Sequence, residues 1–189
     1  MRPSKRSDIL AAAARLVQRE GIAAVRYDSI AAESGITKGG LVYHFPSREE
    51  LITALHEYLA AQWDQAVAAA TGKPADQATE TERLEGYVRA ATQGATRAEL
   101  LFLLEGSTTS DHAAAWDAAL TRWVPPAPTT VTDAVTAEAF VTRLAADGLW
   151  MYEALASSPL TPDFRRQIAE LIADRIPDPP ALERDHTTD

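Results

Sequence analysis

The spacing of apolar residues constrains the fold of this chain more than any other feature of the sequence. Through almost its whole length apolar side chains recur every three or four positions, while alternating runs of β-branched residues are scarce. A helix with 3.6 residues per turn gathers such a pattern on one face, whereas a strand needs a period of two. Of the 189 residues 46% are hydrophobic, which is enough to bury a core. We therefore predict an all-α globular protein.

Glycine and proline divide the first fifty residues into short segments. Gly21 and Gly35 each follow an apolar segment with helical spacing, and Pro46 follows a third. Glycine readily adopts the left-handed conformation that ends a helix, and proline cannot simply continue one. Thr37 supplies a hydroxyl that caps the third segment. We therefore expect three short helices, over about residues 7–20, 28–34 and 38–45.

A long helix follows these three. Ser47 and Glu50 form a predicted capping box, in which the hydroxyl and the carboxylate satisfy each other's free backbone amides. Further helices are expected at about 80–94, 96–107, 111–124, 136–156 and 162–176. The chain then divides into an N-terminal domain (1–48), a body (49–176) that begins with a connecting helix (47–70), and a flexible tail (177–189).

Charge is distributed unevenly along the chain. The net charge is -9, but residues 1–48 contain eight Lys or Arg and four acidic residues, a balance of +4, which leaves -13 on the remainder. A basic segment can follow a phosphate backbone while an acidic remainder is repelled from it. A chance asymmetry is the alternative, so charge alone does not decide the function.

Residues 30–45 have the spacing of a helix-turn-helix. On a helical wheel Leu41 and Phe45 share the core side of the third helix, so Gly39, Gly40 and Tyr43 lie on the opposite side. Two glycines cost a helix roughly 1 kcal/mol each relative to alanine. Their presence indicates that this face approaches something bulky at close range, such as the wall of a DNA groove.

Polar groups around this face suit phosphate and sugar. Lys38 and the free amides after Thr37 lie at the positive end of a helix, and Tyr43 can donate its hydroxyl to a phosphate or stack on a sugar. An arginine at the start of the next helix can reach a neighbouring phosphate. Ordinary solvated side chains are the alternative. The predicted DNA contacts are Thr37, Lys38, Gly39, Gly40, Tyr43, His44 and Arg48.

Over about its first 55 residues the chain resembles the TetR family of bacterial regulators. The matching residues are Ile9 to Gly21, Ile30-Ala31, Gly35-Ile36-Thr37-Lys38-Gly39 and His44-Phe45. Two positions depart from the family pattern: Val42 stands where tyrosine is usual, and Arg26 stands where a serine or threonine usually caps the second helix.

The resemblance implies a sequence-specific, DNA-binding transcriptional regulator. It implies a homodimer on a palindromic operator of double-stranded DNA, with a long helix that links each DNA-binding domain to a ligand-binding and dimerising body. Among the predicted contacts Thr37, Lys38, Tyr43, His44 and Arg48 fall where the family contacts DNA. We expect a repressor that a small-molecule effector releases; a DNA-binding activator or adaptor without such an effector is the alternative.

Aromatic and apolar residues are dense between residues 87 and 152, and some of them are candidates for lining a ligand cavity. Filling the core of a helical bundle is the alternative for each of them. Acidic and histidine side chains among them can meet a polar or cationic group of a ligand. The predicted pocket residues are Phe102, Glu105, His112, Trp116, Trp150 and Met151.

The last two predicted helices carry apolar residues over more than one side. Such helices usually bury both sides, and packing against their own body uses one of them. A second copy of the chain is the predicted partner, and a fully intramolecular bundle is the alternative. The predicted dimer contacts are Phe140, Leu144, Gly148, Phe164, Ile168, Leu171 and Ile172.

Other classes of protein are disfavoured. The chain has no cysteine, no nucleotide-binding glycine loop, no Gly-x-Ser-x-Gly turn and no pair of metal-ligand spacing on one helix. We therefore expect no enzyme activity, no cofactor and no metal ion. No apolar run is long enough to cross a bilayer and no export signal is recognisable, so we expect a cytoplasmic protein.

Overall fold

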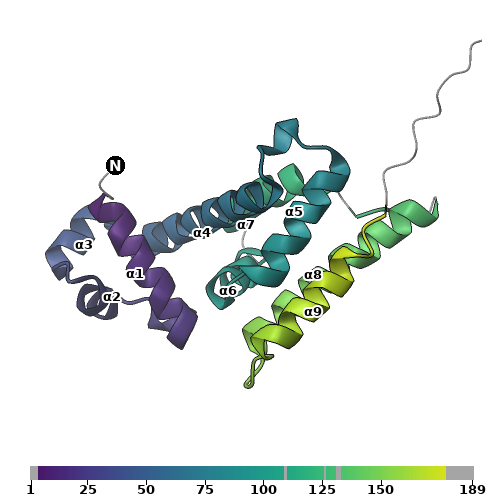
Figure 1. Ribbon diagram of the computed structural model, residues 1–189. Coiled ribbons are helices and arrows are strands. Elements are labelled where there is room, and N and C mark those ends of the chain that lie inside the picture. Colours follow the sequence, from purple (N-terminus) through teal and green to yellow (C-terminus); the bar gives the residue numbers. More distant parts are fainter. Residues whose placement is uncertain (1–3, 109, 126, 131–132, 178–189) are drawn as a thin grey trace, which may run out of the picture.

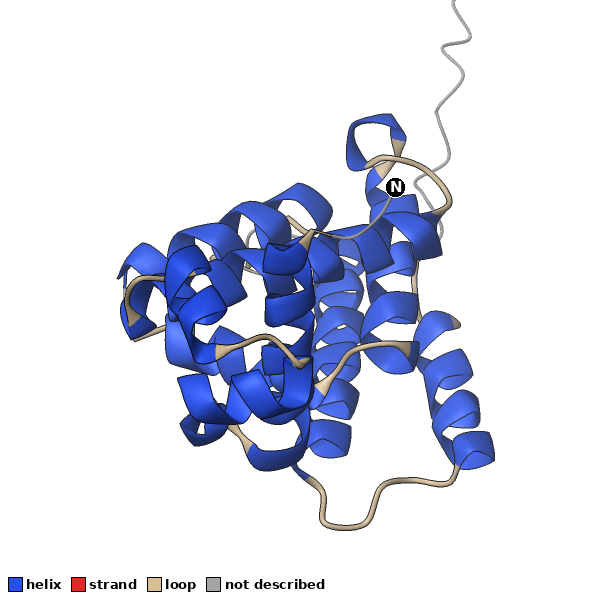
Figure 2. Cartoon of the chain, turned by 90° about the vertical axis from the view of Figure 1, so that its left-hand side faces the viewer, coloured by secondary structure: helices blue, strands red, loops and turns tan. Residues whose placement is uncertain are grey.

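The computed structural model describes residues 4–108, 110–125, 127–130 and 133–177, and these form helices, turns and loops without a β-strand (Figure 2). The predicted all-α class is therefore confirmed. Among the described helices, none combines the length and the apolar character that a membrane crossing requires. The predicted tail lies, from residue 178 onward, outside the described residues.

Three short helices form the N-terminal end of the molecule: α1 (Lys5–Glu20), α2 (Tyr27–Ser34) and α3 (Lys38–His44) (Figure 1). Gly21 and Gly35 end the first two with positive φ angles of 83° and 70°, as their positions predicted. Helix α1 begins two residues earlier than expected because the Ser4 hydroxyl caps it, accepting a hydrogen bond from the backbone N–H of Ser7 (3.2 Å). A short 3₁₀ turn, η1 (Ile22–Ala24), was not predicted.

The long helix α4 (Arg48–Thr71) leaves this group and runs into the body (Figure 1). The Ser47 hydroxyl accepts from the backbone N–H of Glu50 (3.1 Å), as expected. The second half of the predicted capping box differs. The Glu50 carboxylate accepts from the Ser47 hydroxyl (3.3 Å) and not from the Ser47 backbone amide. Complete capping boxes occur instead on the next two helices, with Thr79 and Thr96 as caps.

The body adds η2 (Ala75–Gln77), α5 (Glu80–Gln93), α6 (Arg97–Gly106), α7 (Ser110–Trp123), α8 (Ala134–Leu155) and α9 (Pro162–Ala173). Helix α4 packs against α5, α6 and α7, and α8 and α9 pack on α5. Figure 1 shows α8 and α9 side by side on the side of the body away from α1–α3. Helix α8 starts two residues before the predicted start at Thr136, because the Asp133 carboxylate caps it by accepting from the Thr136 backbone N–H (2.7 Å).

One continuous core runs from the N-terminal helices into the body along α4. Near the start of α4, Leu51 and Leu55 are buried in this core, and near its end Trp63 and Val67 are buried, with the Trp63 ring edge-on to that of Tyr87 on α5 (5.6 Å). Helix α4 also contacts α1 of the N-terminal group. Each buried large side chain of this kind stabilises the fold by about 1.5–3 kcal/mol. The connecting helix is therefore anchored in both parts of the molecule.

An ion-pair network joins α1 to α2. Arg15 donates to the Glu33 carboxylate (2.9 Å) and Arg19 donates to its other oxygen (2.7 Å). These two hydrogen bonds, Arg19 first, lower the pKa of Glu33 to about 2. Both arginines are more than half exposed, so the network fixes the angle between two helices at the surface and adds no core.

We expect Glu33→Gln to lower the melting temperature near pH 7 and to matter less in acid. The folded-state pKa of about 2 lies below the ordinary value of 4.5, so ionised Glu33 stabilises the fold above pH 4.5. This contribution disappears as the pH falls from 4.5 toward 2. Thermal unfolding of both proteins at pH 7 and pH 3 tests the expectation; an equal difference at both pH values would contradict it.

Candidate nucleic-acid interface

Helix α3 buries one side and exposes the other. Leu41 and Phe45 are buried in the core, as the helical wheel predicted. On the outer side Tyr43 is 83% exposed and Val42 is 45% exposed, an unusual state for large apolar or aromatic side chains. A face of this kind, displayed on the second helix of a helix-turn-helix, is available to enter a groove.

The two glycines of α3 differ in their surroundings. A Cβ atom on Gly39 would meet nothing within 4 Å, so this position faces open space. A Cβ atom on Gly40 would lie 3.0 Å from Cγ2 of Ile36 and 3.3 Å from the Thr37 hydroxyl, which itself accepts from the Gly40 backbone N–H (3.2 Å). Gly40 therefore serves the tight turn between α2 and α3, and only Gly39 matches the predicted outward role.

Charged and polar candidates lie around this exposed face. Lys38 forms an ion pair with Asp28 of α2 (2.9 Å), so a phosphate would compete with an exposed carboxylate for its ammonium group. His44 is half-buried, with its ring edge-on to that of Tyr43 at 5.3 Å. Arg48 is exposed at the first residue of α4, beside the end of α3.

Two residues that the sequence did not single out hold α3 in place. The Tyr27 hydroxyl donates to the backbone carbonyl of Phe45 (2.6 Å) and so ties the end of α3 to the start of α2. The guanidinium of Arg6 lies over the Phe45 ring, 4.9 Å from its centre. The absence of a side-chain cap at Arg26 is also confirmed, because α2 starts without one.

The residues predicted to line a ligand pocket fall into two groups. Glu105 and His112 meet beside His56 of α4, and Phe102 and Trp116 are buried around them. Trp150 is buried elsewhere, with its indole N–H bonded to the Thr96 carbonyl (3.0 Å). Met151 is 47% exposed on the outer side of α8. The structure thus brings four of the six residues together and separates Trp150 and Met151 from them.

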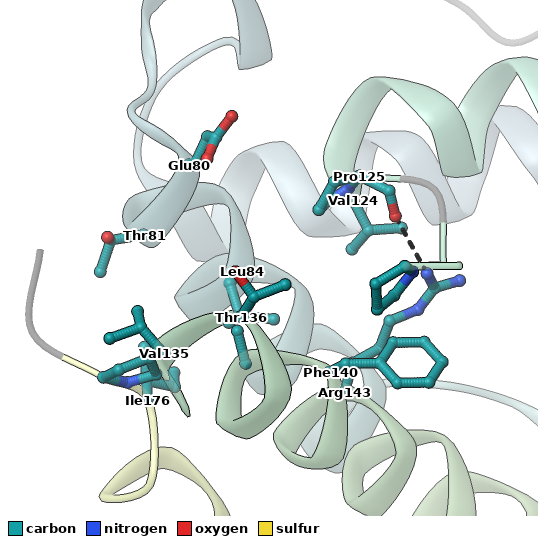
Figure 3. A pocket seen from close by; sticks show the side chains of 13 residues that line it. Glu80, Thr81, Leu84, Val124, Pro125, Val135, Thr136, Phe140, Arg143 and Ile176 are labelled. Atoms are coloured by element: carbon teal, nitrogen blue, oxygen red, sulfur yellow. Dashed lines mark hydrogen bonds between the residues drawn. The ribbon is translucent and has the colours of Figure 1, made fainter. Parts of the chain in front are cut away.

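A different cavity of about 280 Å³ opens where α5, the end of α7 and the start of α8 meet (Figure 3). Its walls are mainly apolar, and none of the six predicted residues lines it. Phe140, predicted as a dimer contact, is one of its walls. Its lining residues include Glu80, Leu84, Val124, Val135, Phe140 and Arg143.

Arg143 supplies a charged group in the wall of this cavity. One guanidinium nitrogen donates to the backbone carbonyl of Pro125 (3.3 Å; Figure 3), and Nε lies 3.8 Å from the Asp147 carboxylate. Nε is buried and makes no hydrogen bond within the described part of the chain. Asp147 also accepts a hydrogen bond from Tyr87, and burial raises the pKa of both groups. The cavity therefore combines apolar walls with one partly neutralised cation.

The predicted dimer contacts divide into exposed and buried residues. Leu144, Phe164 and Leu171 are at least half exposed, and a Cβ atom on Gly148 would meet nothing within 4 Å. Ile172, in contrast, is buried in its own chain, and Ile168 is half-buried against the same core. The expectation that these two isoleucines face outward is therefore corrected: they form the inner side of α9.

Comparison with known families decides the identity of the chain. The family model for bacterial regulatory proteins of the tetR family matches residues 9–55, the helix-turn-helix and the start of α4. The model described as the tetracyclin repressor-like C-terminal domain matches residues 81–177, about half of the chain. The chain belongs to the TetR family. It is a DNA-binding transcriptional regulator, as the resemblance of its first 55 residues implied.

Solved structures of TetR-like proteins share the fold. AibR, solved with isovaleryl coenzyme A and operator DNA, is 25% identical, with 90% of this chain and 96% of AibR covered and a TM-score of 0.60. A putative regulator from Saccharomonospora viridis, in complex with choline, is 21% identical (89% and 95% covered, TM-score 0.65). The multidrug binding protein EbrR, with malachite green, is 22% identical (93% and 100% covered, TM-score 0.58). No curated protein matches the chain.

We expect Gly39→Leu in this TetR regulator to weaken DNA binding while stabilising the fold. Replacing an unrestrained helical glycine should raise the free energy of unfolding by about 0.5–1 kcal/mol, whereas a leucine side chain fills the space that a groove wall would occupy. Operator affinity should fall at least about tenfold, a loss of about 1.4 kcal/mol. Gly39→Ala is the matched control with little bulk. Unchanged operator affinity of the Gly39→Leu protein would show that this face of α3 does not contact DNA.

Proposed function

We propose that the chain is a repressor that binds a palindromic operator as a homodimer and releases it when a small molecule occupies the body. The exposed outer face of α3 carries the proposal: Gly39 and Tyr43 form its surface, and Lys38 and Arg48 flank it. Residues 1–48, with a charge of +4, would be the DNA-binding domain. Residues 49–176, which begin with the connecting helix, would be the regulatory and dimerising body.

The DNA contacts would have separate roles. Lys38 and Arg48 would bind phosphates and fix the position of the protein, which adds affinity without sequence preference. Tyr43 has the most exposed side chain of α3, and its hydroxyl would reach a phosphate or sugar in the major groove. The Thr37 hydroxyl would hold the first turn of α3, the recognition helix. His44, half-buried, would lie at the edge of the contact.

A second copy of the chain would cover the exposed stripe on α8 and α9. The stripe follows helical spacing on α8 and continues on the adjacent α9, and its members are Val141, Leu144, Gly148, Met151, Tyr152, Leu155, Phe164 and Leu171. An apolar patch of this kind on both helices is typical of an interface and is costly to leave in water. A two-fold pair would present two reading helices to the two halves of a palindrome.

The cavity beside Arg143 would hold the effector. Its volume of about 280 Å³ is close to the lower end of the range for small-molecule sites, so it suits a compact molecule with an apolar body. AibR, the Saccharomonospora regulator and EbrR each hold a small molecule, and AibR also holds operator DNA. Such a molecule would release DNA only if it favours a body conformation that holds the two reading helices at the wrong separation.

Selecting bound sequences from random duplex DNA tests the proposed function directly. We expect a palindromic consensus with half-sites about one helical turn apart, and binding that weakens steeply as salt increases. Recovery of no sequence preference, or of a single unrepeated half-site, would contradict the proposal.

Lys38→Ala should weaken binding to the selected operator and to unrelated DNA by the same factor, because a phosphate contact does not distinguish bases. The slope of log affinity against log salt should become shallower by about one for each phosphate that is no longer neutralised. Lys73→Ala is a matched control: Lys73 is also ion-paired to a carboxylate (2.7 Å to Glu82) but lies at the far end of α4. If Lys38→Ala and Lys73→Ala change DNA affinity and its salt dependence equally, the predicted phosphate contact of Lys38 is wrong.

Leu171→Arg should convert the dimer to a monomer that stays folded. Leu171 is 60% exposed in the single chain, so the arginine costs the monomer little, whereas at a two-fold interface it buries an unpaired charge. Sedimentation at micromolar concentration measures the change, and operator affinity should fall by at least about a hundredfold with the loss of avidity. Leu104→Arg, at an exposed leucine of α6 outside the stripe, should change neither the oligomeric state nor the operator affinity. A dimeric Leu171→Arg protein would contradict this interface.

A further inference from the structure

Three helices bring two imidazoles to one carboxylate. Glu105, near the end of α6, points the same oxygen, Oε2, at Nε2 of His56 on α4 (2.6 Å) and at Nδ1 of His112 on α7 (3.2 Å). The two rings are stacked, 4.3 Å apart. Gly106 makes this approach possible, because a Cβ atom there would lie 3.2 Å from the His56 ring. The three ligand-type atoms all lie within 4.8 Å of one another.

Hydrogen bonds define where the protons lie in this cluster. The indole N–H of Trp116 donates to Nδ1 of His56 (3.0 Å), so the proton of that imidazole is on Nε2 and is donated to Glu105. Burial also lowers the pKa of His56, which agrees with the neutral imidazole that the hydrogen bond from Trp116 requires. In a neutral His112, Nδ1–H donates to Glu105 and Nε2 accepts from the Thr53 hydroxyl (3.3 Å). In this state the two nitrogens that face Glu105, Nε2 of His56 and Nδ1 of His112, each carry a proton.

We propose that His56, Glu105 and His112 bind a divalent ion of the zinc class. The ion would be held by the Glu105 carboxylate and by the two nitrogens that face it. Two imidazoles and one carboxylate are a ligand set that Zn²⁺ takes with water as its fourth ligand. Both nitrogens already face the same carboxylate oxygen of Glu105, and Glu105 is about a third exposed, which leaves a side open to solvent. Each imidazole keeps its single proton, which moves to the nitrogen that faces away from the metal.

The two histidines differ in how well their second nitrogen suits that exchange. Nε2 of His112 faces the Thr53 hydroxyl, which accepts a hydrogen bond as readily as it donates one, so the moved proton is satisfied. Nδ1 of His56 faces the N–H of Trp116, so after the exchange two donors would oppose each other. Trp116 therefore stabilises the metal-free state, and the ion must displace its indole.

This site would connect metal to DNA through α4. His56 and Thr53 lie in the first half of α4, a helix that contacts α1 of the N-terminal group, whereas Glu105 and His112 lie on α6 and α7 of the body. An ion that draws the three side chains into one coordination sphere changes how α4 sits against α6 and α7. The effect on DNA rests on the regulatory function proposed above, whereas metal binding does not.

Equilibrium dialysis of the full-length chain, without an affinity tag, against ZnCl₂ tests the site itself. We expect one ion bound per chain at micromolar zinc, and no binding of Mg²⁺, which prefers oxygen ligands. Glu105→Gln keeps the shape of the side chain and removes its charge, so zinc affinity should fall at least about tenfold. Glu57→Gln, at an exposed neighbour of His56, is the matched control and should leave it unchanged. Absence of stoichiometric zinc, or a Glu105→Gln protein that binds like wild type, would overturn the site.

Trp116→Phe separates a metal site from a purely structural hydrogen-bond cluster. Because the substitution removes the N–H that opposes Nδ1 of His56, zinc affinity should rise several-fold even though the fold loses packing. Circular dichroism checks that the variant is folded, and competition with a chromophoric chelator measures affinity. Unchanged or weaker binding in the folded variant would contradict the assignment of Nε2 of His56 as a ligand.

Operator binding with and without zinc then separates the two levels of the proposal. If the wild-type protein binds zinc and operator affinity shifts, while Glu105→Gln shows no shift, zinc is an effector. If zinc binds without a shift, the site holds and its regulatory role is wrong. If the protein binds no operator but binds zinc, the proposed function fails and the metal site remains.

Discussion

Burial of one face of α4, from Leu51 to Val67, is the constraint on which the rest of the structure depends. Leu51 and Leu55 are buried near the start of α4, and Trp63 and Val67 are buried near its end, all in one continuous core. Helix α4 contacts α1 of the N-terminal group as well as α5, α6 and α7 of the body. Neither end can shift freely, because each buried side chain contributes about 1.5–3 kcal/mol. In the proposed response to an effector, a displacement of α4 in the body would reach α3 through the N-terminal core, which includes Leu41 and Phe45.

Local signals were sufficient to predict the three N-terminal helices, although not the η1 turn between α1 and α2. Gly21, Gly35 and Thr37 end or begin helices by their own backbone or hydroxyl chemistry, which needs no distant partner. Leu41 and Phe45 were correctly predicted as buried because a short amphipathic helix has only one apolar side. The different role of Gly40 was hidden because its neighbour Ile36 approaches only once the turn has formed.

The body was predictable in its helices but not in its contacts. Ile172 and Leu171 are adjacent on α9, yet one is buried and the other is 60% exposed, and apolar character alone does not say which side faces its own chain. Trp150 and Met151 are separated in the same way on α8. The cluster of His56, Glu105 and His112 unites three helices, so no spacing along one helix reveals it. The cavity likewise forms between helix ends that meet only after folding.

In the proposed homodimer, operator recognition would depend on two α3 helices that the paired bodies hold at a fixed separation. Hydroxyl-radical footprinting of the wild-type protein on its selected operator measures that separation. We expect two protected regions on one face of the duplex, with centres about 10–10.5 base pairs apart or a multiple of this, appearing together as protein is added. A single protected region, or two regions that fill independently, would contradict this arrangement.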